Sequence, residues 1–73
     1  MIMKIFEVLV TSVPDRENLV AEIWHDNKLI AEINSETGVQ EIIFYCEKET
    51  AFDYQELINA LKEASLKLKE EVI

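Results

Sequence analysis

The chain has 73 residues, of which 15 are acidic and seven are basic, giving a net charge of −8 at neutral pH. A chain of this length has room for one hydrophobic core, so a single domain over residues 1–73 is expected. The acidic excess runs through both halves of the chain and disfavours direct nucleic-acid binding, which depends on clustered lysines and arginines.

The N-terminal residues do not read as a targeting segment. Lys4 and Glu7 interrupt the opening apolar run, and no small-residue cleavage site follows it, so no signal peptide is predicted. No apolar run approaches the roughly 18 residues that a membrane helix needs. We therefore expect a cytoplasmic protein with no membrane partner.

Residues 4–11 predict the first strand, because they are rich in β-branched and aromatic residues. Their alternation puts Phe6, Val8 and Val10 on one face of the sheet and leaves Glu7 on the other. Residues 12–18 contain the only proline and several turn-forming residues, which predicts a connection rather than a strand.

Residues 19–24 and 28–34 predict a β-hairpin around His25, Asp26 and Asn27. We expect a three-residue turn with Asn27 in the left-handed conformation and Trp24 opposite Lys28, because this register gives one wholly apolar face. A two-residue turn of Asp26 and Asn27 would mix apolar and polar residues on each face. His25 is interpreted as a turn residue, since a hairpin tip offers no pocket for acid–base chemistry.

The only glycine, Gly38, predicts a turn before a fourth strand over residues 39–46. We expect Ile42, Phe44 and Cys46 to face the core, with Glu41, Ile43 and Tyr45 on the other face. The single Cys46 excludes an internal disulfide and is expected to be a small buried hydrophobic residue in a reducing compartment.

The C-terminal residues predict a helix that begins after Asp53. Asp53 is the expected N-cap, Glu56 completes a capping-box pair, and Phe52 is placed to pack on Leu57. An apolar stripe with helical spacing is expected to cover the sheet: it consists of Tyr54, Leu57, Ile58, Leu61, Ala64, Ser65, Leu68 and Val72. Glu63 and Lys67 have the spacing of a favourable i,i+4 ion pair.

Together these elements predict an α+β fold with a single-layer antiparallel four-stranded sheet, a ββββ meander, packed on one C-terminal helix. No glycine-rich phosphate loop, nucleophile elbow, zinc-ligand pair or calcium loop is present in the sequence. We expect no enzymatic activity, no metal and no cofactor.

The sheet face away from the helix is the most informative surface. Each strand is expected to place one glutamate on it, among apolar and aromatic side chains, and a contiguous apolar area with a tryptophan is typical of an interface. The predicted contact residues are Trp24, Glu22, Ile30 and Glu32 at the centre, with Glu41 and Tyr45. Alternatively, the 12–18 connection or the C-terminal residues fold over this face.

Two function classes fit such a face. The first is an acidic protein-binding module, of the inhibitor or immunity type, that docks on a basic partner. The second is a structural protein that forms a homodimer through the same face, which would supply stability that a small core lacks. Packing the glutamates of two copies against one another counts against the dimer.

Overall fold

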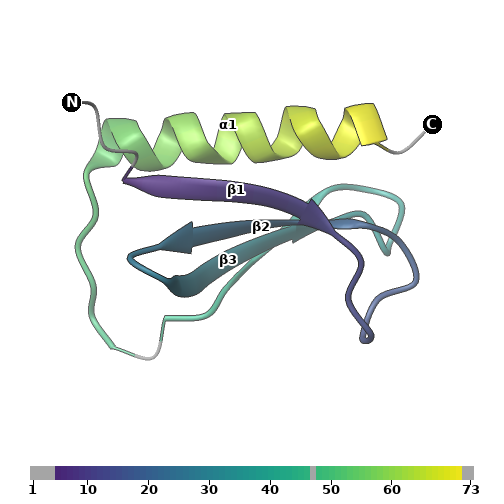
Figure 1. Cartoon of the computed structure of the whole chain (residues 1–73), viewed down its shortest axis with the longest axis horizontal. Coiled ribbons are helices and arrows are strands. Elements are labelled where there is room, and N and C mark those ends of the chain that lie inside the picture. Colours follow the sequence, from purple (N-terminus) through teal and green to yellow (C-terminus); the bar gives the residue numbers. More distant parts are fainter. Residues whose placement is uncertain (1–4, 47, 72–73) are drawn as a thin grey trace.

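The computed structural model describes residues 5–46 and 48–71, which form one antiparallel sheet and one helix (Figure 1). The elements are β1 (Phe6–Thr11), β2 (Val20–His25), β3 (Lys28–Asn34), β4 (Glu41–Phe44) and α1 (Tyr54–Glu71). The strand order is β1-β2-β3-β4, so neighbours in the sequence are neighbours in the sheet. The predicted α+β meander with a C-terminal helix is confirmed. Lys4, the predicted first residue of β1, lies outside the described residues.

The core lies between the sheet and α1. Its centre is Ala21 and Ile23 of β2, Ala31 of β3 and Ala64 of α1, none of which exposes any surface. Small residues on the helix let its backbone approach the sheet closely. Val8 and Val10 pack at the margin of this cluster beside Phe6, Leu57 and Leu61, which confirms the predicted inward face of β1.

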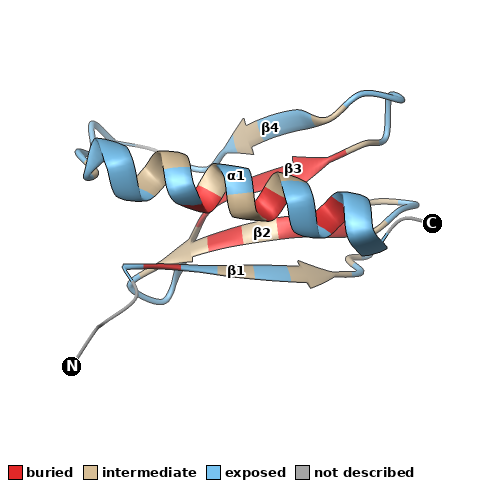
Figure 2. Ribbon diagram, turned by 90° about the horizontal axis from the view of Figure 1, so that it is seen from above, coloured by how far each residue is buried: buried red, intermediate tan, exposed pale blue. Residues whose placement is uncertain are grey.

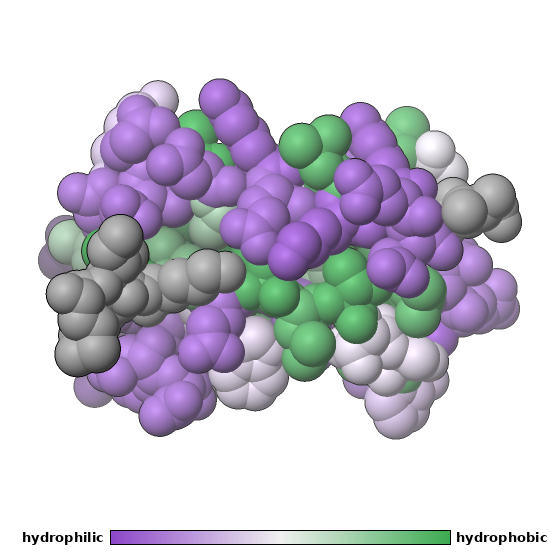
Figure 3. Space-filling view, turned by 45° about the horizontal axis from the view of Figure 1, so that its top comes forward, coloured by the Kyte–Doolittle hydropathy of each residue, from purple (hydrophilic) through white to green (hydrophobic). Residues whose placement is uncertain are grey.

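The predicted helix start is confirmed. The backbone N–H of Glu56 donates to the Asp53 Oδ1 at 2.8 Å, which is the N-cap bond, and the Leu57 N–H donates to the Asp53 carbonyl at 3.0 Å. Phe52 packs on the core edge-on to the rings of Phe6 and His25. The outer surface of α1 is predominantly hydrophilic (Figure 3), and the Glu63–Lys67 ion pair forms there at 2.9 Å.

The turn between β2 and β3 differs from the predicted one. Asp26 and Asn27 both have positive φ, 52° and 64°, and His25 pairs with Lys28, which makes this a two-residue turn with the primed geometry. A bulge then shifts the register, so that Trp24 pairs with Leu29 and Ile23 with Ala31, and Ile30 is the extra residue. The bulge returns the apolar residues to one face, which is why the two-residue turn does not mix the faces.

Replacing Asp26 with glycine is expected to stabilise the protein by about 0.5 kcal/mol, because glycine adopts positive φ without the steric cost that aspartate has there. Urea denaturation of the variant and the wild type measures the difference. In the three-residue turn expected from the sequence, residue 26 would have a negative φ and the same change would be destabilising. A loss of stability would therefore contradict the observed turn.

The inward face of β4 is less covered than predicted. Its register places Ile42 opposite Ile33 and Phe44 opposite Ala31, so both side chains are on the helix side as expected. They are nevertheless 41% and 51% exposed, and Cys46 is also exposed rather than buried. The reason is that the sheet is wider than the helix: one helix is about 10 Å across, whereas four strands that lie about 4.8 Å apart cover a greater width. Helix α1 packs on β1 and β2, and less on β3, while β4 lies to one side (Figure 2).

The apolar stripe of α1 is correspondingly narrower than predicted. Ala64 and Leu68 are buried, but Tyr54, at the start of the stripe, is 77% exposed. Val72, its predicted end, lies outside the described residues. At the C-terminal half of the helix, the Gln40 and Ser65 side chains are hydrogen-bonded, and the Gln40 amide also donates to the Ser65 carbonyl at 3.1 Å. These contacts fix the start of β4 to the helix. Among the described residues, no helix is both long and apolar enough to cross a membrane.

Candidate functional site

The sheet face opposite α1 carries the predicted row of glutamates. Glu22 pairs directly with Glu32 across β2 and β3, Glu7 pairs with Trp24, and Glu41 pairs with Asn34. Since paired residues point to the same face of a sheet, these side chains share one surface. We call this surface the acidic face.

Residues 12–18 lie over part of the acidic face. The Arg16 Nε donates to the Glu32 Oε2 at 2.8 Å, which brings the connection across β2 to β3. Val20 has no exposed surface although it is not part of the core cluster under α1. The prediction of a bare sheet face is therefore wrong in this part. Residues 12–18 fold over it, as the alternative interpretation of the sequence proposed.

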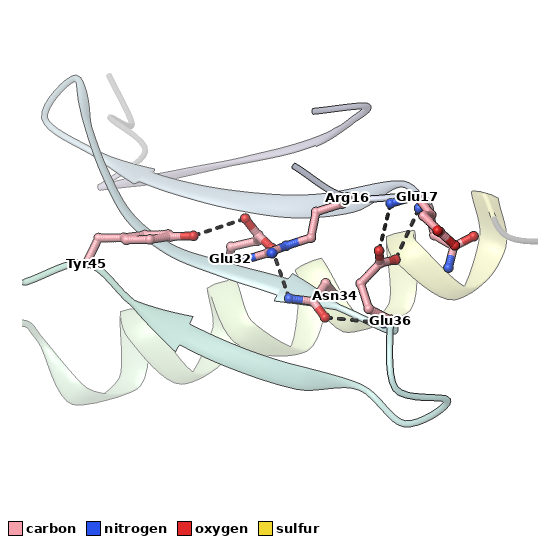
Figure 4. A network of polar contacts seen from close by, with 7 residues as sticks. Arg16, Glu17, Glu32, Asn34, Glu36 and Tyr45 are labelled. Carbon is pink, nitrogen blue, oxygen red and sulfur yellow. Dashed lines mark hydrogen bonds and ion pairs between the residues drawn. The ribbon is translucent and has the colours of Figure 1, made fainter. Parts of the chain in front are cut away.

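Glu32 is the centre of a polar network on this face. Besides Arg16, the Asn34 Nδ2 donates to its Oε2 at 2.9 Å and the Tyr45 hydroxyl donates to its Oε1 at 3.1 Å (Figure 4). Burial by itself would raise the pKa of Glu32, but the hydrogen bonds from Arg16, Asn34 and Tyr45 outweigh it, so its pKa lies below the ordinary value. The pKa of Tyr45 is raised, first by burial and then by its bond to this carboxylate.

Glu36 fixes the other end of the connection. Its carboxylate accepts hydrogen bonds from the backbone N–H groups of Glu17, at 2.7 Å, and Asn18, at 3.1 Å (Figure 4). The bond from Glu17 is the main reason that the pKa of Glu36 is below its ordinary value. Asn34 joins the two clusters, because its Oδ1 accepts from the Glu36 N–H at 3.3 Å. Residues 12–18 are thus held at two places: at Arg16 by Glu32, and at Glu17 and Asn18 by Glu36.

Replacing Arg16 with glutamine is expected to loosen residues 12–18 while leaving the core intact, because the Glu36 contacts and the core contacts do not involve this side chain. Amide hydrogen exchange should accelerate by about tenfold in residues 12–18 and stay unchanged at Ile23. Lys67→Gln, which breaks the exposed Glu63 pair on α1, is the matched control and should change neither. Unchanged exchange in residues 12–18 would show that Arg16 does not hold them.

The six predicted contact residues divide into three groups. Glu32 and Ile30 are buried, at 4% and 6% exposure; Ile30 is the bulge residue and joins the core under α1, so neither offers contact area. Glu22 and Trp24 are half-buried, and the Trp24 Nε1 donates to the Glu22 Oε1 at 3.2 Å. Glu41 and Tyr45 are exposed, as expected.

Arg16 was not among the predicted site residues, because the alternative that residues 12–18 fold over this face named no side chain that would hold them there. One signal could have found it: Arg16 is the only arginine in the chain and lies where a strand face offers several glutamates. A planar guanidinium is well suited to bind a carboxylate that is leaving water.

The part of the acidic face that residues 12–18 leave open lies toward β1 and the hairpin tip. Ile5 and Leu9 are 43% and 52% exposed there. A hollow of about 220 Å³ lies beside them, and it is lined by Ile5, Glu7, Trp24, Asp26 and Asn27. This hollow combines an indole with two carboxylates, which are the groups that attract a lysine or arginine side chain.

Within residues 5–46 and 48–71, no three histidine, cysteine, aspartate or glutamate side chains are grouped so as to hold a metal ion. Comparisons of the chain with protein-family models, with curated proteins and with solved structures give no match. Its function is therefore inferred from its own residues.

Proposed function

We propose that the protein is a binding module that docks on a basic surface of a partner protein through the open part of the acidic face. The observation that carries this proposal is the hollow beside Trp24, in which Glu7 and Asp26 flank an accessible aromatic ring. Tryptophan is enriched among the residues that dominate binding energy, and carboxylates around it select a basic partner and speed its approach.

The net charge of −8 supports the same proposal. Long-range attraction from an acidic surface raises the association rate with a basic protein and repels nucleic acid. Small acidic inhibitors and immunity-type proteins act in this way by covering basic sites on larger proteins, and this role is proposed by that analogy of surface chemistry. We propose no catalytic activity for the protein. We also propose that it is cytoplasmic, because an exposed, unpaired cysteine such as Cys46 persists in a reducing compartment.

Self-association through the acidic face is the competing function. Two copies packed through it would bring Glu7, Glu22 and Glu41 of each against the same residues of the other, while the only arginine is already paired with Glu32. Like charges facing each other across an interface are costly. The apolar residues Ile5 and Leu9 would gain burial in either assembly, so the charge decides in favour of a heterologous basic partner.

A site-specific photo-crosslinker tests the proposal. The crosslinker is placed either at Leu9, on the acidic face, or at Leu66, on α1. Both leucines are more than half exposed, so the two positions differ only in which surface of the protein the crosslinker samples. Crosslinking at position 9 to a basic protein, with no such product at position 66, would support the proposal. Crosslinks from position 9 only to a second copy would establish self-association instead, and equal products from both positions would contradict a specific face.

Replacing Trp24 with alanine is expected to weaken binding to the crosslinked partner by at least about tenfold, because truncating a central aromatic contact typically costs about 2 kcal/mol or more. Titration calorimetry measures the change. Leu66→Ala on the opposite surface is the control and should leave the affinity unchanged. Thermal unfolding of both variants is needed as well, because Trp24 is half-buried: a large loss of stability with unchanged affinity would make it a structural residue.

A further inference from the structure

A second cavity lies at the tip of the β2–β3 hairpin, where the sequence predicted none. Two of its lining residues are shared with the surface described above: Tyr45 belongs to the acidic face and Asp26 to the Trp24 hollow. The cavity has a volume of about 540 Å³, within the range of roughly 300–1,000 Å³ that is usual for small-molecule sites. One side is lined by residues of the hairpin, and the other by Tyr45, Cys46, Lys48, Thr50 and Phe52, which lie between β4 and α1 in the sequence.

The apolar wall of this cavity is fixed before any ligand arrives. Phe52 and His25 line it, and their rings are 5.2 Å apart in an edge-to-face arrangement. The ring of Phe6, which is buried in the core, lies between them: its centroid is 5.6 Å from that of Phe52 and 5.0 Å from that of His25. The wall is therefore anchored to β1, β2 and the residue before the helix cap. Edge-to-face rings of this kind favour a flat, aromatic ligand.

The bulge in β3 contributes to the same site. Ile30, the extra residue, and Leu29, which precedes it, both line the cavity, and so does Tyr45, whose N–H donates to the Ile30 carbonyl at 2.8 Å. In a hairpin without the bulge, Leu29 and Ile30 would point to opposite faces and only one of them could line it. Further apolar surface is thus placed next to the aromatic wall.

The charges around the cavity differ from those of the rest of the molecule. Lys28 and Lys48 line it, two of only seven basic residues in the chain, and Asp26 is the one acidic residue among the lining groups that the structure describes. The ion pairs found within residues 5–46 and 48–71 are those of Arg16 and Lys67, and Lys28 and Lys48 take no part in them. Ammonium groups beside an apolar wall suit an anionic headgroup.

We propose that this cavity binds a small aromatic anion, with the ring against Phe52 and His25 and a carboxylate or sulfonate near Lys28 and Lys48. The site shares Asp26 with the Trp24 hollow but has its own apolar wall, and it does not depend on the proposed partner. Cys46 lines the same cavity and is the only cysteine, so it reports occupancy without a label.

Naphthalene sulfonate is the probe, and naphthalene methanol is its uncharged counterpart. The expected result is saturable binding of the sulfonate, with NMR shift changes confined to the cavity residues and slower alkylation of Cys46 by a neutral maleimide. The combined change Lys28→Gln and Lys48→Gln should weaken sulfonate binding by about tenfold and leave binding of the alcohol unchanged.

The matched control is the combined change Lys62→Gln and Lys69→Gln on α1, which removes the same charge away from the cavity and should alter neither ligand. Absence of saturable binding, shift changes spread over the molecule, or equal effects of the two lysine pairs would overturn the proposal. Binding of the alcohol as tight as that of the sulfonate would overturn the anion preference. A variant that fails to fold is recognised by its amide spectrum, and the single changes then replace it.

Discussion

Replacing Ile23 with alanine is expected to lower the free energy of unfolding by about 3–4 kcal/mol, the largest effect of any single truncation considered for this protein. Ile23 has no exposed surface and lies in the middle of β2 under α1, among small residues that cannot fill the space it would vacate. A domain of 73 residues has roughly 4–11 kcal/mol in total. The variant should therefore lose at least about a quarter of the stability of the domain.

Urea denaturation followed by circular dichroism measures this loss. Leu9→Ala is the control, since Leu9 is 52% exposed on β1 and its truncation leaves no cavity; it should cost less than about 1 kcal/mol. A cost at Ile23 no greater than that at Leu9 would show that α1 does not pack on β2 as described.

Replacing Glu32 with glutamine is expected to cost about 2 kcal/mol at neutral pH, because hydrogen bonds to a charged acceptor contribute about 1.5–3 kcal/mol and a glutamine accepts them without the charge. Glu32 is only 4% exposed and receives bonds from Arg16, Asn34 and Tyr45. The amide NH₂ of a glutamine would also replace one acceptor oxygen with a donor, which Tyr45 could meet only by turning its hydroxyl to accept.

The cost should depend on pH in a defined direction. The folded-state pKa of Glu32 lies below its ordinary value, so its ionised form stabilises the fold above the unfolded pKa of about 4.3 and this stabilisation is lost as the pH falls through the folded pKa. The difference between wild type and Glu32→Gln should be greatest near pH 7 and shrink below about pH 4. Glu7→Gln, which removes a carboxylate at an exposed position of the same face, is the control and should change the free energy of unfolding by no more than about 0.5 kcal/mol at neutral pH. If the stability difference between wild type and Glu32→Gln were the same at every pH, the effect would come from the shape of the side chain and not from its charge.

Features decided by neighbouring residues could be predicted from the sequence. The helix start depends on Asp53 and residues within one turn of it, and the face of β1 depends on simple alternation of Phe6, Val8 and Val10. Gly38, the only glycine, does have positive φ, at 97°, and its N–H donates to the Ser35 carbonyl at 3.1 Å. In each case a short-range steric or hydrogen-bonding rule determines the result.

Features that depend on distant contacts could not be predicted in the same way. The bulge at Ile30 removes hydrogen bonds between β2 and β3 at that position, which is unfavourable locally. The bulge also realigns Ala31 and Ile33 with the core, and this stabilises the protein only when the whole sheet has formed. Arg16 is paired with a residue 16 positions away, and nothing near it in the chain indicates this. The exposure of Phe44 follows from where α1 lies across the sheet, which is a property of the whole fold.

The meander has a consequence for the order in which the structure can form. Each strand pairs with the strand next to it in sequence, so the sheet closes only short loops, whereas α1 returns to β1 across nearly the whole chain. The apolar face of the sheet has no partner until that return, and the first hairpin by itself is marginal in water. During synthesis the chain can therefore pair its strands as they leave the ribosome, but it gains its core only once the last residues of α1 have emerged. Loss of the C-terminal helix, as in a prematurely terminated chain, would leave an unfolded product rather than a smaller domain.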